Sequence, residues 1–177
     1  LAIMSEIDGV VSFREIKKSQ HVVVTGDDGD EKTYLIPYGF RLKVMEGQRI
    51  SKGAQLTEGA QSPHDILAIL GVEAVHDYLI REVQRTYRMQ GVDINDKHIE
   101  VIVRQMMRKV RIAEPGASKF LPGVVVEKME FRLENERIAK EAAEKGEEPQ
   151  LATYVPTLMG ITKASLATDS FLSAASF

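Results

Sequence analysis

Cysteine is absent from this sequence, and so is any long apolar run. Without cysteine the chain has no disulfide framework, no thiolate metal site and no cysteine nucleophile, and it is compatible with a reducing, cytoplasmic setting. Crossing a bilayer takes about 20 consecutive apolar residues, so we expect no membrane partner. A strong excess of one charge is also missing, because 23 Lys and Arg face 26 Asp and Glu, a net charge of −3.

Short catalytic motifs are missing too. The sequence contains no Walker-type phosphate loop, no dinucleotide-binding glycine pattern and no hydrolase nucleophile elbow. Four histidines fall on different predicted elements, and no pair has HExxH spacing: His21, His64, His76 and His98. From the residues alone we predict no catalytic residue, no metal site and no cofactor in this chain.

The residues that are present are typical of a soluble globular protein, with 44% hydrophobic and 28% charged side chains. A length of 177 residues suits one large or two small domains. We expect an α+β chain in which an N-terminal all-β module over residues 1–60 precedes a mainly helical region. That region divides into helices over 61–113, a loop, acidic helix and connector over 114–157, and a final segment over 158–177.

Residues 1–60 alternate β-favouring runs with glycine-bearing turns. Strands are predicted at 9–13, 21–25, 32–36 and 41–44. The following stretch, Val44–Leu56, resembles the hammerhead of barrel-sandwich hybrid domains, the fold of lipoyl and biotinyl carriers. The lysine hairpins that carry those cofactors do not occur here, so the resemblance implies the fold without the cofactor.

Helical periodicity begins after Ser62 and Pro63, a capping residue and a proline suited to a first helical turn. Helices are predicted over 63–70 and 72–90, and a third is predicted to follow with Asn95 or Asp96 as its capping residue. The inward residues of this third helix are expected to be Ile99, Ile102, Val103, Met106 and Val110.

The third helix is also expected to carry a basic stripe. Arg104, Arg108 and Arg111 are spaced at i, i+4 and i+7, which places them on one helix face. Such a stripe could contact phosphates or a neighbouring subunit. Solvated arginines, or arginines paired with acids elsewhere, are the alternative, and composition favours it.

The remaining residues are predicted to form a loop, a strand at 124–126, a solvated acidic helix over 133–145 and an extended connector over 151–159. A polar stretch over 160–171 then leads into an apolar helix. Its hydroxyls and amides can bind phosphates while Lys163 supplies positive charge, or it can be an ordinary capped loop. The residues alone weigh these two interpretations equally.

Five stretches taken together resemble the β′ family, the largest catalytic subunits of bacterial DNA-directed RNA polymerases. They are 6–13, 63–67, 87–92, 94–106 and 158–177, and they follow the family's order. The resemblance implies the C-terminal portion of such a subunit. In that family the β module corresponds to the jaw along the downstream DNA channel, and residues 160–177 correspond to the start of switch 1 at the base of the clamp.

The resemblance further implies a part in DNA-templated RNA synthesis by a nucleotidyltransferase. This chain would contribute to the downstream DNA channel, the clamp and subunit contacts but no reacting group, and it would be inactive alone. The family's Mg²⁺ and Zn²⁺ sites lie outside the stretches matched here. Implied partners are downstream duplex DNA and the polymerase subunits β, α, ω, sigma factor and the remainder of β′. Lys163 becomes the candidate phosphate contact, with Thr162 and Ser165 as secondary candidates.

A second function from another class remains open, namely a docking platform for transcription regulators or phage inhibitors on the jaw. DNA requires a positive surface, yet acidic residues gather at one hairpin tip: Asp27, Asp28, Asp30 and Glu31. Both ends of the chain also read as cut from a longer polypeptide, since it opens on Leu1 and stops inside an apolar helix at Phe177.

Overall fold

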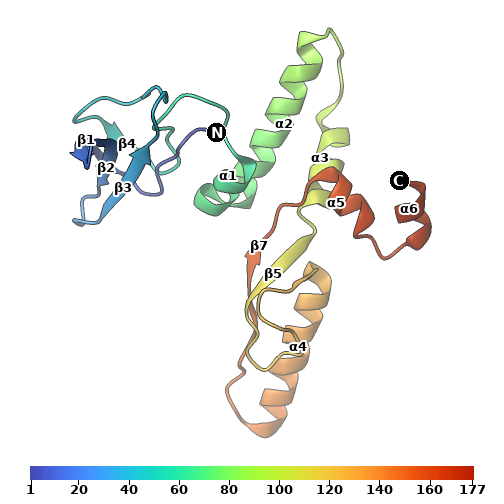
Figure 1. Cartoon of the computed structure of the whole chain (residues 1–177). Helices are drawn as coiled ribbons and strands as arrows, with labels where there is room; N and C mark the ends of the chain where they lie inside the picture. The colour runs from blue at the N-terminus through green and yellow to red at the C-terminus, as the bar shows by residue number, and fades with distance from the viewer. The chain divides into compact units, whose positions relative to one another are not determined.

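The computed structural model describes all residues, 1–177, and divides into two compact units, Leu1–Tyr78 and Leu79–Phe177. Strands dominate the first unit and helices contribute most of the second, which confirms the predicted α+β class (Figure 1). The boundary between the units falls inside a helix, and the finer division into four segments stays a prediction. None of the helices combines the length and apolarity needed to span a membrane.

A curled antiparallel sheet of four strands, in the order β3-β2-β1-β4, forms the framework of the first unit (Figure 1). Its strands are β1 (Gly9–Ile16), β2 (Ser19–Thr25), β3 (Glu31–Ile36) and β4 (Arg49–Ile50). The β1–β2 hairpin pairs from Val10 opposite Thr25 to Ile16 opposite Ser19. Lys17 and Lys18 make its turn with φ angles of 50° and 64°, the positive values that a tight hairpin connection requires.

The core of this unit combines alternate residues of the strands with residues of the hammerhead segment Val44–Leu56. Its fully packed members are Val11, Val22, Val24, Ile36, Val44, Ile50 and Leu56. The strand predicted at 41–44 is wrong, because only Leu42 forms a bridge, with Thr57. Two backbone hydrogen bonds flank that bridge, from Lys43 to Leu56 and from Glu58 to Arg41, and the pairing continues no further.

Two helices follow the sheet as predicted, α1 (Pro63–Leu70) and α2 (Val72–Met89). Pro63 occupies the first turn of α1, where its missing amide leaves no hydrogen bond unmade. The side chain of Ser62 makes no capping hydrogen bond, so its predicted capping role is not observed. Gly71 separates the two helices with a φ of 94°, a conformation that favours glycine.

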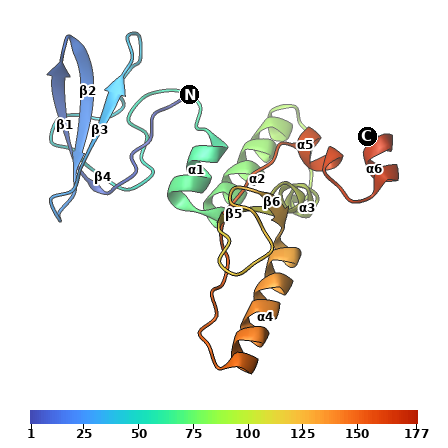
Figure 2. The same cartoon turned by 60° about the horizontal axis from the view of Figure 1, so that its bottom comes forward.

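The second unit joins helices to a three-stranded antiparallel sheet in the order β6-β5-β7. After the rest of α2, its elements are α3 (Asp96–Met106), β5 (Lys109–Glu114), β6 (Val125–Glu127), α4 (Lys128–Lys145), β7 (Thr153–Pro156), α5 (Ile161–Leu166) and α6 (Phe171–Ser176). Figure 2 shows α4 continuing directly from β6. One face of the sheet packs on α4 around a core of Val110, Ile112, Phe120, Phe131 and Ala152.

The third predicted helix is shorter than expected. Asn95 caps it as predicted, its side chain accepting a hydrogen bond from the Lys97 amide, but the helix ends at Met106. From Lys109 onward buried Val110 and Ile112 alternate with exposed residues, which is the period of a strand. Ile99 and Val103 are buried as predicted, whereas Ile102 is 49% exposed.

The acidic helix begins earlier than expected and is not fully solvated. It extends over α4, and a stripe along it is buried: Phe131, Glu134, Ile138 and Ala142. These positions recur at intervals of three and four residues, so they share the face that packs against the sheet and the 115–123 loop. The strand predicted at 124–126 is confirmed as β6, and the predicted extended connector contains β7.

Candidate functional site

Helix α5 carries the candidate phosphate contacts, and the structure fixes it at both ends. Just before the helix, the amide of Met159 donates to the carbonyl of Met106 at 2.9 Å. Just after it, Nζ of Lys109 donates to the carbonyl of Ala167 at 3.0 Å. Both partners flank the short junction between α3 and β5. These two hydrogen bonds therefore hold the helix against the junction between α3 and β5.

The three candidates on α5 differ in availability. Thr162 and Lys163 are exposed, and Lys163 takes part in no ion pair. Ser165 is half-buried, and its Oγ donates to the carbonyl of Ile161 at 2.8 Å. Since that hydroxyl proton is already engaged within the helix, Ser165 is the weakest phosphate donor of the three.

A cavity of about 400 Å³ lies beside α5, between that helix, α3 and α6. Its lining is mainly apolar and includes Val101, Ile102, Met106, Ile161, Ala164 and Phe177. Of the six residues proposed from the sequence, Arg108 and Ser165 line this cavity and the other four do not. The structure thus brings together one arginine and one hydroxyl from segments far apart in the sequence.

Arg108 is tied to a neighbouring acid. Its Nη2 lies 3.1 Å from Oε1 of Glu127, and both side chains are half-buried, at 33% and 26% exposure. The backbone carbonyl of Arg108 also accepts from the amide of Lys128. This arginine therefore links the turn after α3 to the junction of β6 and α4.

The predicted arginine stripe is wrong as a single helix face. Arg104 lies on α3, Arg108 in the following turn and Arg111 on β5, because the helix ends at Met106. Arg111 pairs across the sheet with Val125 and Val155, both exposed. Cross-strand partners share a face. Arg111 accordingly lies between two exposed valines on the opposite sheet face from Ile112.

Sequence reasoning did not single out Lys109. Its hydrogen bond to Ala167 joins residues far apart in the chain, and no local pattern signals that contact. Nowhere in the structure do three or more histidine, aspartate or glutamate side chains gather so as to hold a metal ion.

A comparison with protein families matches residues 4–169 to the model described as RNA polymerase Rpb1, domain 5. Proteins named DNA-directed RNA polymerase subunit beta′ are similar over essentially the whole chain. Those of Acetivibrio thermocellus, Pelotomaculum thermopropionicum and Desulforudis audaxviator are 59%, 56% and 57% identical over 177, 176 and 176 residues. These alignments cover 100%, 99% and 99% of this chain but only 15%, 14% and 15% of the relatives' length.

Proposed function

This chain belongs to the RNA polymerase Rpb1, domain 5 family, and we propose that it serves as a non-catalytic part of a bacterial DNA-directed RNA polymerase. The observation that carries the proposal is similarity along the entire chain to β′ subunits. In this role the chain contributes to transcription in the cytoplasm through the downstream DNA channel, the clamp and contacts with β, α, ω, sigma factor and the rest of β′. The enzyme's Mg²⁺ and Zn²⁺ are held by other parts of the subunit.

Lys163 is the residue proposed to contact a DNA phosphate. It is exposed, it has no ion-pair partner, and α5 is anchored at both ends, which favours a fixed position for the helix that carries the lysine. Thr162 is exposed beside it and offers a second donor. A phosphate contact at the base of a mobile clamp links clamp closure to DNA occupancy, because each state then favours the other.

The arginines receive different proposed roles. Arg104 and Arg111 are exposed and are available to phosphates or to a neighbouring subunit. Arg108 pairs with Glu127 inside the second unit. Replacing Arg108 would therefore disturb the junction of β6 and α4 more directly than it would disturb DNA binding. The three arginines lie on a helix, a turn and a strand, and these positions do not support a single DNA-binding surface made of all three.

Replacing Lys163 with alanine in the assembled polymerase is expected to weaken open complexes several-fold. Losing one phosphate contact also makes the slope of log DNA affinity against log salt concentration shallower by about one unit. Filter binding of promoter complexes across a salt series measures both quantities. Lys140→Ala is the matched control, because Lys140 is an exposed lysine on α4 that takes no part in an ion pair. An unchanged salt slope in the Lys163 variant would count against the phosphate contact.

Protein docking on the first unit is the second candidate function, and exposed apolar side chains favour it. Leu35 is 55% exposed on the edge strand β3, Tyr38 is exposed in the turn that follows, and Met45 is exposed further along the chain. Near the β2–β3 turn, Arg49 pairs with Asp27 and holds the pKa of that carboxyl below its ordinary value, while Asp28 and Asp30 remain without an ion pair.

Docking on this surface predicts that regulators retained by the wild-type polymerase are lost from a polymerase carrying Tyr38→Ala and Leu35→Ala together. Equal retention by the two polymerases would count against docking here.

A further inference from the structure

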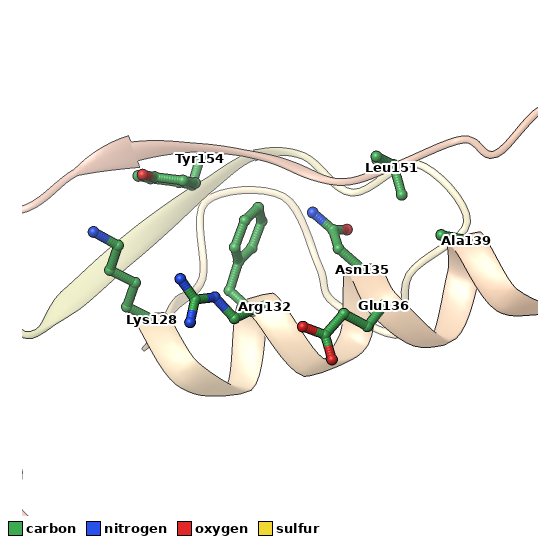
Figure 3. A pocket seen from close by; sticks show the side chains of 8 residues that line it. Lys128, Arg132, Asn135, Glu136, Ala139, Leu151 and Tyr154 are labelled. Atoms are coloured by element: carbon green, nitrogen blue, oxygen red, sulfur yellow. The ribbon is translucent and has the colours of Figure 1, made fainter.

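A second cavity, of about 390 Å³, lies between α4 and the segment that leads into β7. Figure 3 shows Lys128 and Tyr154 at one end of it and Ala139 and Leu151 at the other. Phe131 and Tyr154 meet edge to face, with ring centroids 4.8 Å apart and planes inclined at 75°. The cavity therefore offers an aromatic and aliphatic floor to an apolar side chain.

Asn135 holds the two walls of this cavity together. Its Nδ2 donates to the carbonyl of Ala152 at 3.0 Å, and its Oδ1 accepts from the amide of the same residue at 2.9 Å. This paired contact fixes α4 against the start of β7. Tyr154 lies opposite Ile112 in the register, so its ring belongs to the sheet face that α4 covers. The cavity is thus preformed and does not depend on a loop closing.

Charge along the rim is predominantly positive. Lys128 and Arg132 are one helical turn apart on α4, both are exposed, and neither takes part in an ion pair. Glu136 is the single acidic residue in the lining. Two unpaired cations beside an apolar floor complement a ligand that combines carboxylates with an apolar side chain.

The adjoining strand has a free side. β7 lies at the edge of the sheet β6-β5-β7 and pairs only with β5. Backbone groups on an unpaired edge can add a further strand from another chain, and side-chain pockets next to that edge then select the sequence. Here the edge and the cavity adjoin at Tyr154, which belongs to both.

We propose that this edge and cavity bind an extended acidic segment of a protein partner. The segment pairs with β7, inserts an aromatic or aliphatic side chain over Phe131 and Tyr154, and places carboxylates near Lys128 and Arg132. Residues two apart in a strand share a face. The recognised pattern is therefore acidic-x-apolar-x-acidic. The aromatic floor and the aliphatic wall at Leu151 favour such a peptide over the phosphates of a nucleic acid.

The test uses the whole 177-residue chain and a fluorescent capped peptide, Glu-Thr-Phe-Thr-Glu-Thr, followed by anisotropy. The peptide is expected to bind, and its counterpart with lysine in place of glutamate is expected to bind at least tenfold more weakly. The double variant Lys128→Gln, Arg132→Gln should lose at least tenfold in affinity for the acidic peptide. Lys140→Gln, an exposed cation of α4 outside the cavity lining, should change it less than twofold.

Two N-methylated versions of the acidic peptide test strand pairing, each blocking one alternate set of backbone amides. Only one set can face β7, so one version should bind at least tenfold more weakly than the other. The proposal is overturned by equal binding of the acidic and basic peptides, by equal binding of the two methylated peptides, or by no binding of the acidic peptide. Tighter binding of a thymidine octanucleotide, lost in the double variant, would also overturn it in favour of a nucleic-acid site.

Discussion

Replacing Leu56 with alanine is expected to lower the free energy of unfolding of the first unit by about 3 kcal/mol. Leu56 is fully buried, and it joins the hammerhead segment to the valines of β1 and β2. Its backbone also bonds to Ile3 and Lys43, which holds the surrounding chain in place and limits collapse into the space that the side chain leaves. The expected cost is therefore the lost burial plus that of a residual cavity.

Amide hydrogen exchange measures this cost within the first unit alone. For the amides of Val22–Val24, about 3 kcal/mol corresponds to exchange roughly 150-fold faster, if exchange proceeds through unfolding of the unit. Leu35→Ala is the matched control, since Leu35 is 55% exposed on β3 and should change the rates little. Similar rates in both variants would mean that the core does not depend on Leu56.

Replacing Glu134 with alanine is expected to destabilise the second unit by about 2 kcal/mol. This carboxylate is 6% exposed and accepts three hydrogen bonds, two from Arg137 and one from the Lys119 amide. The Lys119 contact fastens the 115–123 loop to α4. Losing it should accelerate amide exchange in that loop, and Glu136→Ala, at an exposed neighbouring position, should not.

The same contacts predict a pH dependence. Hydrogen bonds from Arg137, and then from the Lys119 amide, hold the pKa of Glu134 at about 2, below its ordinary value near 4.5. Because the folded-state pKa is depressed, this stabilisation is present in full above about pH 4.5 and is lost as the pH falls toward 2. In the Glu134→Gln variant, the free energy of unfolding of the second unit, measured by urea unfolding, should fall less as the pH drops from about 4.5 toward 2. A profile identical to wild type would contradict the assignment.

Local patterns were enough to predict most elements of this chain. Runs of β-favouring residues bounded by turns identified the first three strands, and proline, glycine and asparagine marked the limits of α1, α2 and α3. The end of α3 was missed because Val103, Met106 and Val110 also fit helical spacing. Residues 109–114 form a strand and not a further turn of helix because they pair with β6 and β7, and those partners lie elsewhere in the sequence.

The candidate site was predicted less completely. Family resemblance pointed to Lys163 and its neighbours, and the structure shows which of them are exposed. The cavity that contains Arg108 and Ser165 depends on packing among α3, α5 and α6, which no spacing rule encodes. Likewise, the lysine pair at the β1–β2 turn gave no signal, since lysine seldom adopts positive φ.

The two hydrogen bonds that flank α5 have a mechanical consequence. Met159 bonds to Met106 at the end of α3, and Ala167 accepts from Lys109 at the start of β5, with only Met107 and Arg108 between those two anchor points. A twist of α5 about its axis must strain both bonds together, whereas a pull at one end loads only one. The segment should thus resist torque more than tension, and a pull applied at Phe177 should open it one bond at a time.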